Sequence, residues 1–330
     1  MGFSPKCFDC FGRISVTVEG IHRAAGTSRF RFEDVPPDIR NEVRALHRVR
    51  PWANLIVFLY PALWICSVGL MKRWPTAPTR IAGVLIIGVS IQAMAIVMHE
   101  ALHGNLFRHS ALDRWVGFAL AVPAFFSISA YKVAHLNHHR CTRSENDQDD
   151  ISNFCRTQKQ YIALFYSWFI IGTVIYMVII PWKAIAIASR RDRRRIVIEY
   201  SLMFLIYAVA VGLAIDTRHA GRLLLYWLIP AEVAVLLSNV RGLAEHLGTP
   251  RKGGVVAKTR TVTSNRLISF LMLNLNYHLE HHLFPGIPWY NLPRLHQLLE
   301  PVCESRGADV RRSYAVYAIE CLRQGPESLR

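Results

Sequence analysis

Long apolar runs without charges are the feature that most constrains how this chain can fold. Residues 53–70 and 81–98 each contain 18 residues and no charge, enough for about 27 Å of helix at 1.5 Å per residue. Residues 196–215 and 223–239 are similar, each with one glutamate. Because lipid offers no hydrogen-bond partner to an exposed backbone, such segments cross a bilayer as helices. The sequence predicts an all-α, multi-pass membrane protein with two transmembrane hairpins, that is, four long spans.

Two further apolar segments are harder to assign. Residues 115–131 are short for a span and are interrupted by Pro123, and residues 161–181 lie between the two predicted hairpins. If the polar segments that flank the hairpins are to meet on one side of the membrane, residues 161–181 cannot cross it once. We expect this segment to be interfacial, re-entrant or bent at Gly172.

The basic residues gather beside the spans. The net charge is +16, and arginines cluster in RNEVRALHRVR (residues 40–50) and in SRRDRRR (residues 189–195). Such juxtamembrane clusters mark the cytoplasmic side and bind anionic headgroups, whereas the basic loop MKRWPTAPTR favours the opposite orientation. We expect membrane lipids and not nucleic acid as partners, with the polar segments in the cytoplasm.

The seven cysteines are scattered, as is typical of a reducing compartment. Cys7 and Cys10 have CxxC spacing, but no second pair follows to complete a zinc site. We interpret this pair as incidental.

Histidines are concentrated in three short motifs, HEALH, HLNHH and HLEHH. On a helix, residues at i, i+3 and i+4 share a face, so each HxxHH motif is expected to project three imidazoles to one side. One zinc needs three or four ligands, so eight imidazoles suit two metal ions. Zinc, copper, iron and nickel all accept imidazole, and the ligand set leaves the metal open. The predicted ligands are His99, His103, His135, His138, His139, His278, His281 and His282.

Two other functions remain open at this point. HEALH fits the HExxH helix of zinc metalloproteases, in which the glutamate, here Glu100, acts as general base. That reading leaves both HxxHH motifs unexplained. A histidine-lined metal transporter would place its ligands inside the spans, whereas HLNHH and HLEHH lie outside them. For His22, His47, His109 and His219 we expect surface or hydrogen-bonded roles.

The three motifs, with NYHLEHHLFPGIPWYNLPRLH around the last, resemble the histidine boxes of the integral-membrane fatty acid desaturase family over roughly residues 50 to 300. The resemblance implies two irons in a cytosolic cap over four helices, O₂ as co-substrate, and a double bond introduced into a fatty acyl lipid. It also implies a separate electron donor, ferredoxin or cytochrome b5, since the sequence contains no His-Pro-Gly-Gly motif. Hydroxylases and ketolases of carotenoids, sterols or alkyl chains share this scaffold and form the alternative.

The resemblance extends to further residues. The family commonly adds a ninth histidine after the last span, for which His246 in RGLAEH is the candidate. Relatives often carry Asp-Pro-Asp after the second box, where this chain has Asp147-Gln148-Asp149, so the stiffness of this loop is in question. The expected outer hydrogen-bond partners of the imidazoles are Asp147, Asp149, Asn276 and His296.

The predicted organisation is a cytosolic segment (1–50), a membrane desaturase domain (51–300) and a cytosolic tail (301–330). Glu100 and Glu280 lie inside boxes but off the histidine face, so we expect them to support rather than to bind metal. The aromatic stretches 115–131 and 284–290 are candidates to line a dry substrate channel.

Overall fold

The computed structural model describes residues 30–325, and helices make up nearly all of its regular structure. This helical content confirms the all-α class for the described part. Cys7, Cys10 and His22 lie outside the described residues. The α-helices are α1 (Arg40–Leu46), α2 (Ile56–Arg73), α3 (Ala77–Leu102), α4 (Ser110–Ala121), α5 (Ile128–Cys141), α6 (Gln158–Ile187), α7 (Arg190–Asp216), α8 (Ala220–Leu223), α9 (Ile229–His246), α10 (Val255–Lys258), α11 (Arg266–Leu271), α12 (His278–Leu283), α13 (Leu292–Ser305) and α14 (Tyr314–Gln324).

Short helical turns and one strand pair connect these helices. The 3₁₀ turns are η2 (Phe32–Asp34), η3 (Pro51–Leu55), η4 (Val122–Ala124), η5 (Ile151–Phe154) and η7 (Trp289–Asn291), and η6 (Leu224–Leu228) is a π-helical turn. Strands β1 (Arg260–Val262) and β2 (Asp309–Arg311) are parallel, with Arg260 opposite Asp309. This pair ties the chain beyond α13 to the segment that precedes α12.

Four helices are long and apolar enough to cross a membrane, as the sequence predicts. They cover Trp52–Arg73, Ala77–Leu102, Arg190–Asp216 and Ala220–His246. Each contains one predicted apolar run and extends beyond it. The extensions matter because His99 and His246 lie in the last turns of α3 and α9, so two of the spans carry histidines out of the apolar layer.

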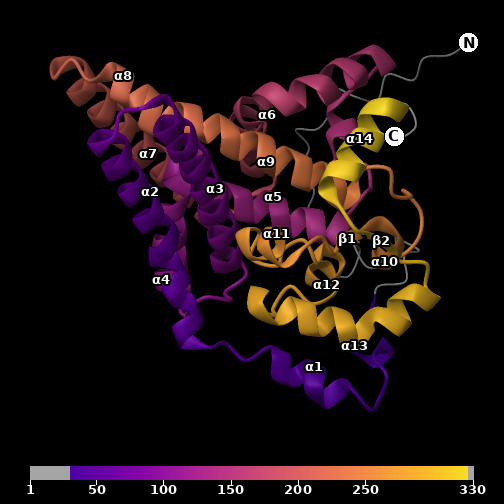
Figure 1. Cartoon of the computed structure of the whole chain (residues 1–330). Helices are drawn as coiled ribbons and strands as arrows, with labels where there is room; N and C mark the ends of the chain where they lie inside the picture. The colour runs from indigo at the N-terminus through magenta and orange to yellow at the C-terminus, as the bar shows by residue number, and fades with distance from the viewer. Residues whose placement is uncertain (1–29, 326–330) are drawn as a thin grey trace, which may run out of the picture.

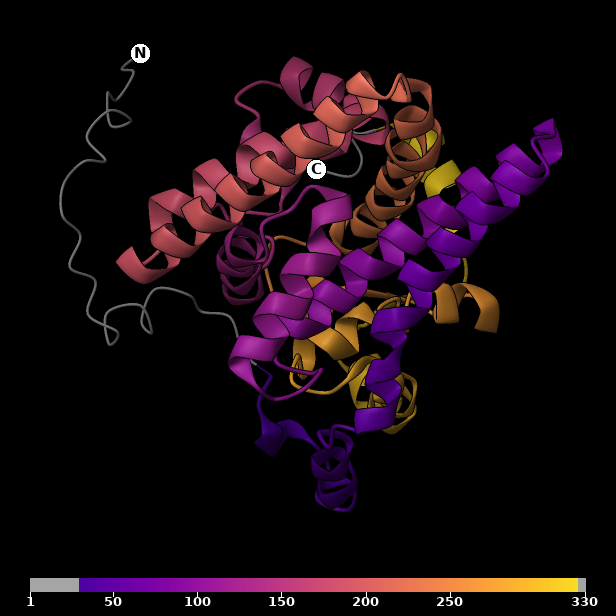
Figure 2. The same cartoon turned by 90° about the vertical axis from the view of Figure 1, so that its left-hand side faces the viewer.

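The surfaces of these helices fit a lipid environment. Large apolar side chains such as Phe58 on α2 and Phe204 on α7 are exposed, which would be unfavourable in water over so wide an area. Helix α3 is instead largely buried, packed between α2 and α9. Figure 2 shows α2 and α3 side by side along much of their length.

Two further apolar segments are bent. Residues 110–124 and 128–141 meet at 96°, and the two arms of α6 meet at 105°. The backbone leaves helical geometry at Ile171, next to Gly172, and the Asn239 side-chain amide of α9 donates to the carbonyl of Trp168 at this point. A Cβ at residue 172 would lie 2.3 Å from Asn239 Nδ2. The bend expected at Gly172 is thus observed beside this residue, and the placement of residues 161–181 in the membrane stays a prediction.

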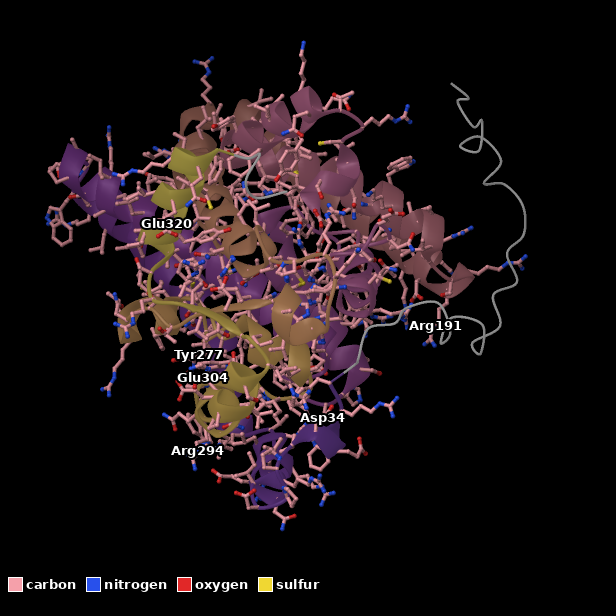
Figure 3. All side chains as sticks on the ribbon, turned by 90° about the vertical axis from the view of Figure 1, so that its right-hand side faces the viewer. Asp34, Arg191, Tyr277, Arg294, Glu304 and Glu320 are labelled. Carbon is pink, nitrogen blue, oxygen red and sulfur yellow. The ribbon has the colours of Figure 1, made fainter. Side chains whose placement is uncertain are left out.

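The segments from α10 to α14 cover the histidine-bearing ends of the long helices, on the opposite side of Figure 1 from α2 and α8. Helix α14 packs on α9, and the Tyr317 hydroxyl donates to the carbonyl of Leu247 over 2.7 Å. Arg294 of α13 pairs with Glu42 of α1 at 2.7 Å. Figure 3 shows Arg294 and Asp34 at this end of the molecule and Arg191 of α7 at a distant edge. The boundary at residue 300 stays a prediction.

Candidate metal centre

The nine predicted histidine ligands come together in two groups at the ends of the long helices. Within each group the candidate ligand atoms lie within 4.8 Å of one another. The five-histidine group contains His99, His103, His135, His139 and His281, and the four-histidine group contains His138, His246, His278 and His282. The described histidines His47, His109, His219 and His296 belong to neither group.

Each HxxHH motif is divided between the two groups. His135 and His139 of α5 join the five-histidine group, but His138 joins the other; in α12, His278 and His282 are together and His281 is apart. On an α-helix the residue at i+4 lies about 40° from i around the axis, and the residue at i+3 about 60° to the other side. All three imidazoles of a motif thus lie on one side of the helix, within about 100°, as expected, but they are shared between two neighbouring groups. The i and i+4 rings serve one group and the i+3 ring serves its neighbour.

The four-histidine group forms a closed ring of Nε2 atoms. His138 lies 3.1 Å from His246 and 3.3 Å from His282, and His278 lies 3.1 Å from both. Four nitrogens at these separations can all lie about 2 Å from one central point, which is the length of a metal–imidazole bond.

The outer nitrogens of this group show why a cation suits it. His138 Nδ1 donates to Asp147 Oδ1 at 2.8 Å, and His246 Nδ1 donates to the carbonyl of Lys258 at 3.0 Å. In the neutral ring a proton on Nδ1 leaves a lone pair on Nε2. Burial lowers the pKa of His138, but the charge and hydrogen bond of Asp147 outweigh burial and raise it to about 9. The His138 ring thus favours a positive charge beside His246 Nε2, 3.1 Å away, and a shared metal ion would supply that charge.

The five-histidine group is less enclosed by hydrogen bonds. Its Nε2 atoms approach closely, with 2.9 Å between His99 and His135, 2.9 Å between His135 and His139, and 3.1 Å between His139 and His281. His103 Nε2 is buried and has no hydrogen-bond partner among the described residues. Buried nitrogens without partners are unfavourable in an apolar interior, so this donor set also fits a metal ion.

The three histidines of α12 are held in the neutral state that a metal requires. Burial is the largest influence on the pKa of His278, His281 and His282 and moves each well below its ordinary value. Each of these rings therefore keeps one nitrogen lone pair free near neutral pH, and the ring need not lose a proton before it binds a metal ion.

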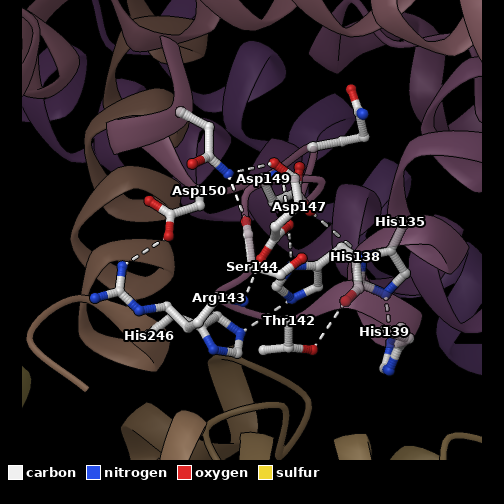
Figure 4. Close-up of polar contacts among 12 residues, drawn as sticks. His135, His138, His139, Thr142, Arg143, Ser144, Asp147, Asp149, Asp150 and His246 are labelled. Atoms are coloured by element: carbon white, nitrogen blue, oxygen red, sulfur yellow. Dashed lines mark hydrogen bonds and ion pairs between the residues drawn. The ribbon is translucent and has the colours of Figure 1, made fainter. Parts of the chain in front are cut away.

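The loop after α5 provides carboxylates behind the imidazoles, as Figure 4 shows. Burial alone would raise the pKa of Asp147, but its contact with His138 and two backbone N–H donors outweigh burial and lower it. Those donors belong to Arg143 and Asp149, at 2.7 and 2.9 Å. Asp147 is thus an ionised acceptor for His138 Nδ1, the role expected of it.

Asp149 lies farther from its imidazole. Its Oδ2 is 3.7 Å from His135 Nδ1, its Oδ1 accepts from the Tyr176 hydroxyl at 3.1 Å, and burial raises its pKa. The loop is rigid without the proline of the relatives, because the Asn153 side-chain amide donates to the carbonyls of Ser144 and Asp147 at 2.8 and 3.0 Å.

Two other predicted partners lie elsewhere. His296 Nδ1 contacts Glu280 Oε1 at 2.6 Å and no imidazole of either group. Glu280 Oε2 accepts from Thr261 Oγ1 at 2.6 Å, so this carboxylate supports α12 from behind, as expected. The Asn276 amide donates to the carbonyl of Val262 at 2.8 Å. It holds β1 against the turn before α12 and contacts no histidine among the described residues.

Glu100 has a supporting contact as well. Its Oε2 accepts the backbone N–H of Trp289 at 3.0 Å and the Asn105 amide at 3.4 Å. The carboxylate thus fastens the segment after α12 to the end of α3. This placement disfavours the general-base role that a metalloprotease would require.

The sequence-based reasoning missed Glu245 and Arg241. Glu245 Oε1 lies 3.5 Å from His278 Nδ1 and 3.5 Å from Arg241 Nε. The signal was present in RGLAEH, where an arginine and a glutamate four residues apart precede His246 near the end of a predicted span.

A cavity leads from the apolar layer to both groups. Its volume is ≈ 160 Å³, and its walls include His99, His138 and the aromatic residues Phe125 and Trp168. It is lined by part of the stretch 115–131, as expected, but by none of residues 284–290. Phe284 instead packs edge-on against Phe30 with ring centres 6.0 Å apart; the expectation for this second stretch is wrong.

Comparison with known proteins agrees with this geometry. The family model described as fatty acid desaturase matches residues 75–314. The chain belongs to the fatty acid desaturase family. This membership, with the four spans and the histidine groups, makes the protein an integral-membrane oxidoreductase and favours neither the protease nor the transporter.

Individual relatives are distant. An sn-1 oleoyl-lipid 12-desaturase of Arthrospira platensis is 23% identical over 74% of this chain and 68% of its own length. A human sphingolipid delta(4)-desaturase/C4-monooxygenase is 24% identical over 78% of this chain and 76% of its own. A zeaxanthin 4-ketolase of Chlamydomonas reinhardtii is 26% identical over 75% of this chain and 51% of its own. The desaturase family thus includes enzymes with several reaction outcomes.

Proposed function

We propose that this protein is an O₂-dependent di-iron desaturase that introduces a double bond into a fatty acyl chain within the membrane. The observation that carries the proposal is the convergence of nine histidines in two adjacent groups at the end of a cavity that opens from the apolar layer. Two irons held there would supply oxidising power, drawn from O₂, for an unactivated methylene group, which redox-inert zinc does not provide.

The reaction needs two electrons from outside. A –CH₂–CH₂– unit, O₂, two electrons and two protons yield –CH=CH– and two waters. We propose that a separate protein, a ferredoxin or a cytochrome b5, delivers these electrons. Because the electrons must reach the two histidine groups, we expect the donor to approach the histidine-bearing face.

The chain's own residues would fix the direction of the histidine rings and shield the substrate chain from water. His138 and His246 present Nε2 because Asp147 and the carbonyl of Lys258 hold their Nδ1 protons. Phe125 and Trp168 form an apolar wall of the cavity, which excludes water from an alkyl chain held there. These contacts would hold a methylene beside the two histidine groups.

We propose that this face lies in the cytoplasm. Helix α7 begins with five arginines in six residues, Arg190–Arg195, and the next residue, Ile196, packs in one buried cluster with Ala134 of α5, beside His135. Helix α1, which pairs with α13 through Glu42 and Arg294, carries further basic residues. An excess of arginine beside short membrane segments indicates the cytoplasmic side.

A second outcome on the same scaffold is hydroxylation or ketone formation. The printed names of two relatives, a desaturase/C4-monooxygenase and a ketolase, support it. The choice depends on the step after the first hydrogen is removed. Removal of a second hydrogen gives a double bond, whereas transfer of an oxygen gives a hydroxyl or a ketone. Both outcomes use the same histidine groups.

Lipid profiling by mass spectrometry tests the proposal in cells that express the wild type or His281→Ala. We expect a lipid two mass units lighter with the wild type only; one sixteen units heavier would indicate the hydroxylase. Purified wild-type protein should contain about two irons per chain, and His281→Ala should lose activity and part of its iron while still inserting in the membrane. A single tightly bound zinc, or full activity of His281→Ala, would contradict the proposal.

A further inference from the structure

We propose that the substrate carries a neutral oxygen acceptor, a carbonyl or a hydroxyl, close to the carbon that reacts, and that Arg241 binds this oxygen. The inference rests on the proposed function and deepens it. Arg241 lies on α9, one turn before Glu245, and lines the cavity that also reaches His99 and His278.

The guanidinium of Arg241 has unused donors. Its Nε and Nη1 atoms are buried and have no hydrogen-bond partner among the described residues. The 3.5 Å from Nε to Glu245 Oε1 makes an ion pair but is too long for a good hydrogen bond. A guanidinium offers five N–H donors in a planar fork, and buried charged donors without acceptors are unfavourable. A ligand with an oxygen at this position would satisfy them.

A second unused donor lines the same cavity from the facing helix. Gln92 of α3 is 3% exposed, and its Nε2 has no partner among the described residues. It lies seven residues, about two turns, before His99 and hence on the same face of α3. An unbranched alkyl chain would have no acceptor for either Gln92 or Arg241.

The position of Arg241 sets how far the oxygen lies from the reacting carbon. One atom, Glu245 Oε1, lies 3.5 Å from Arg241 Nε and 3.5 Å from His278 Nδ1, so these two nitrogens are at most 7 Å apart. His278 Nε2 faces the other imidazoles, so a group bound by Arg241 is separated from the centre of the four-histidine group by at most this distance and the width of one imidazole ring. The remaining chain would lie along the apolar wall that includes Phe125 and Trp168.

The local charge favours a neutral group. Glu245 already balances Arg241 at 3.5 Å, and Asp149 lines the same cavity. A further carboxylate would add like charge here, whereas an ester or amide carbonyl or a hydroxyl accepts from the guanidinium without adding any. The substrate class is thus a lipid oxidised near its oxygen-bearing end, not in the middle of a long acyl chain.

The site of oxidation tests this inference first. Fragmentation mass spectrometry of the product from cells expressing the wild type should place the new double bond or hydroxyl within a few carbons of an oxygen-bearing carbon. A product oxidised in the middle of a long chain would overturn the inference while leaving the proposed function intact. If no lipid is oxidised and purified protein lacks iron, the proposed function itself fails, and the inference with it.

Binding provides a readout independent of turnover. Wild-type protein with its metal, in lipid nanodiscs, should bind dodecanamide more tightly than dodecane. Arg241→Met should weaken dodecanamide binding about tenfold, as loss of a hydrogen bond to a charged donor predicts, and leave dodecane unchanged. Arg241→Lys should retain part of the preference. Arg222→Met, at the other end of the same span, is the matched control and should bind both probes like the wild type. Equal binding of both probes by the wild type would overturn the inference.

If Arg241 serves only to balance the charge of Glu245, a different experimental result is expected. In that case Arg241→Met combined with Glu245→Gln would restore wild-type KM and dodecanamide binding. We expect Arg241→Met to raise KM and the double variant to retain this raised KM, because the donor for the substrate oxygen is missing in both. Recovery of wild-type KM would assign Arg241 to charge balance alone.

Discussion

The two histidine groups differ in how their rings are held from behind. In the four-histidine group, His138 and His246 donate Nδ1 protons to fixed acceptors, and the Nε2 atoms form a closed ring. In the five-histidine group, the nearest carboxylates to His99 and His135 lie 3.8 and 3.7 Å away. One group is thus preorganised by outer hydrogen bonds, and the other relies on an additional ligand.

This difference predicts how each group responds to change. Outer hydrogen bonds fix the tautomer and the direction of a ring before metal arrives. A group of only four rings, two of them fixed from behind, should bind strongly and lose much when one is removed. A group with five less constrained rings should tolerate removal of one ligand better.

The largest expected effect comes from removing one ligand of each group. His282→Ala leaves three imidazoles in the four-histidine group and should reduce the iron content to about one per chain. His281→Ala leaves four in its group and should retain more iron, although both variants should be inactive. Elemental analysis of purified protein measures the difference, with His47→Ala, which lies outside both groups, as control. Equal iron loss in the two variants would show that the groups do not differ in this way.

A smaller effect is expected from the carboxylates behind the rings. Asp147→Asn should weaken metal binding about 10- to 100-fold, because the side chain that fixes the His138 tautomer no longer carries charge. Asp149→Asn should have a much smaller effect, since this carboxylate lies 3.7 Å from His135 Nδ1. Competition with a chelator of known affinity measures both. The comparison of the groups fails if Asp149→Asn is the more damaging substitution.

The smallest effect concerns pH and the contact behind α12. Burial lowers the pKa of His296, but the hydrogen bond and charge of Glu280 outweigh burial and raise it above the ordinary value. A raised pKa in the folded state means that the stabilisation is complete below about pH 6.5 and is lost as pH rises through the folded-state value.

His296→Gln should therefore destabilise the protein by about 1 kcal/mol at pH 6, with the difference shrinking towards pH 9. Thermal unfolding in detergent at the two pH values measures it. Arg294→Gln is the control, because its ion pair with Glu42 is exposed. A His296→Gln effect of equal size at both pH values would rule out the charged contact.

Much of this protein is determined by local sequence. The four spans follow from the length of the uncharged runs, because lipid requires a helical backbone whatever the surroundings. The pairing of the first and last histidine within each motif follows from spacing, because i and i+4 side chains meet on any helix. The resemblance of the boxes to a known family pointed to His246 and to Asp147, and the structure places both beside His138.

Tertiary structure decided the rest. The division of each HxxHH motif depends on how α5 and α12 approach each other, which spacing within one helix does not specify. The bend at Gly172 is completed by Asn239 on a distant helix. His296 contacts Glu280 and not an imidazole, and Arg241 reaches the cavity only because α9 packs against α3. Helical periodicity sets the direction of a side chain around its own axis, but the partner it meets depends on packing between segments far apart in the chain.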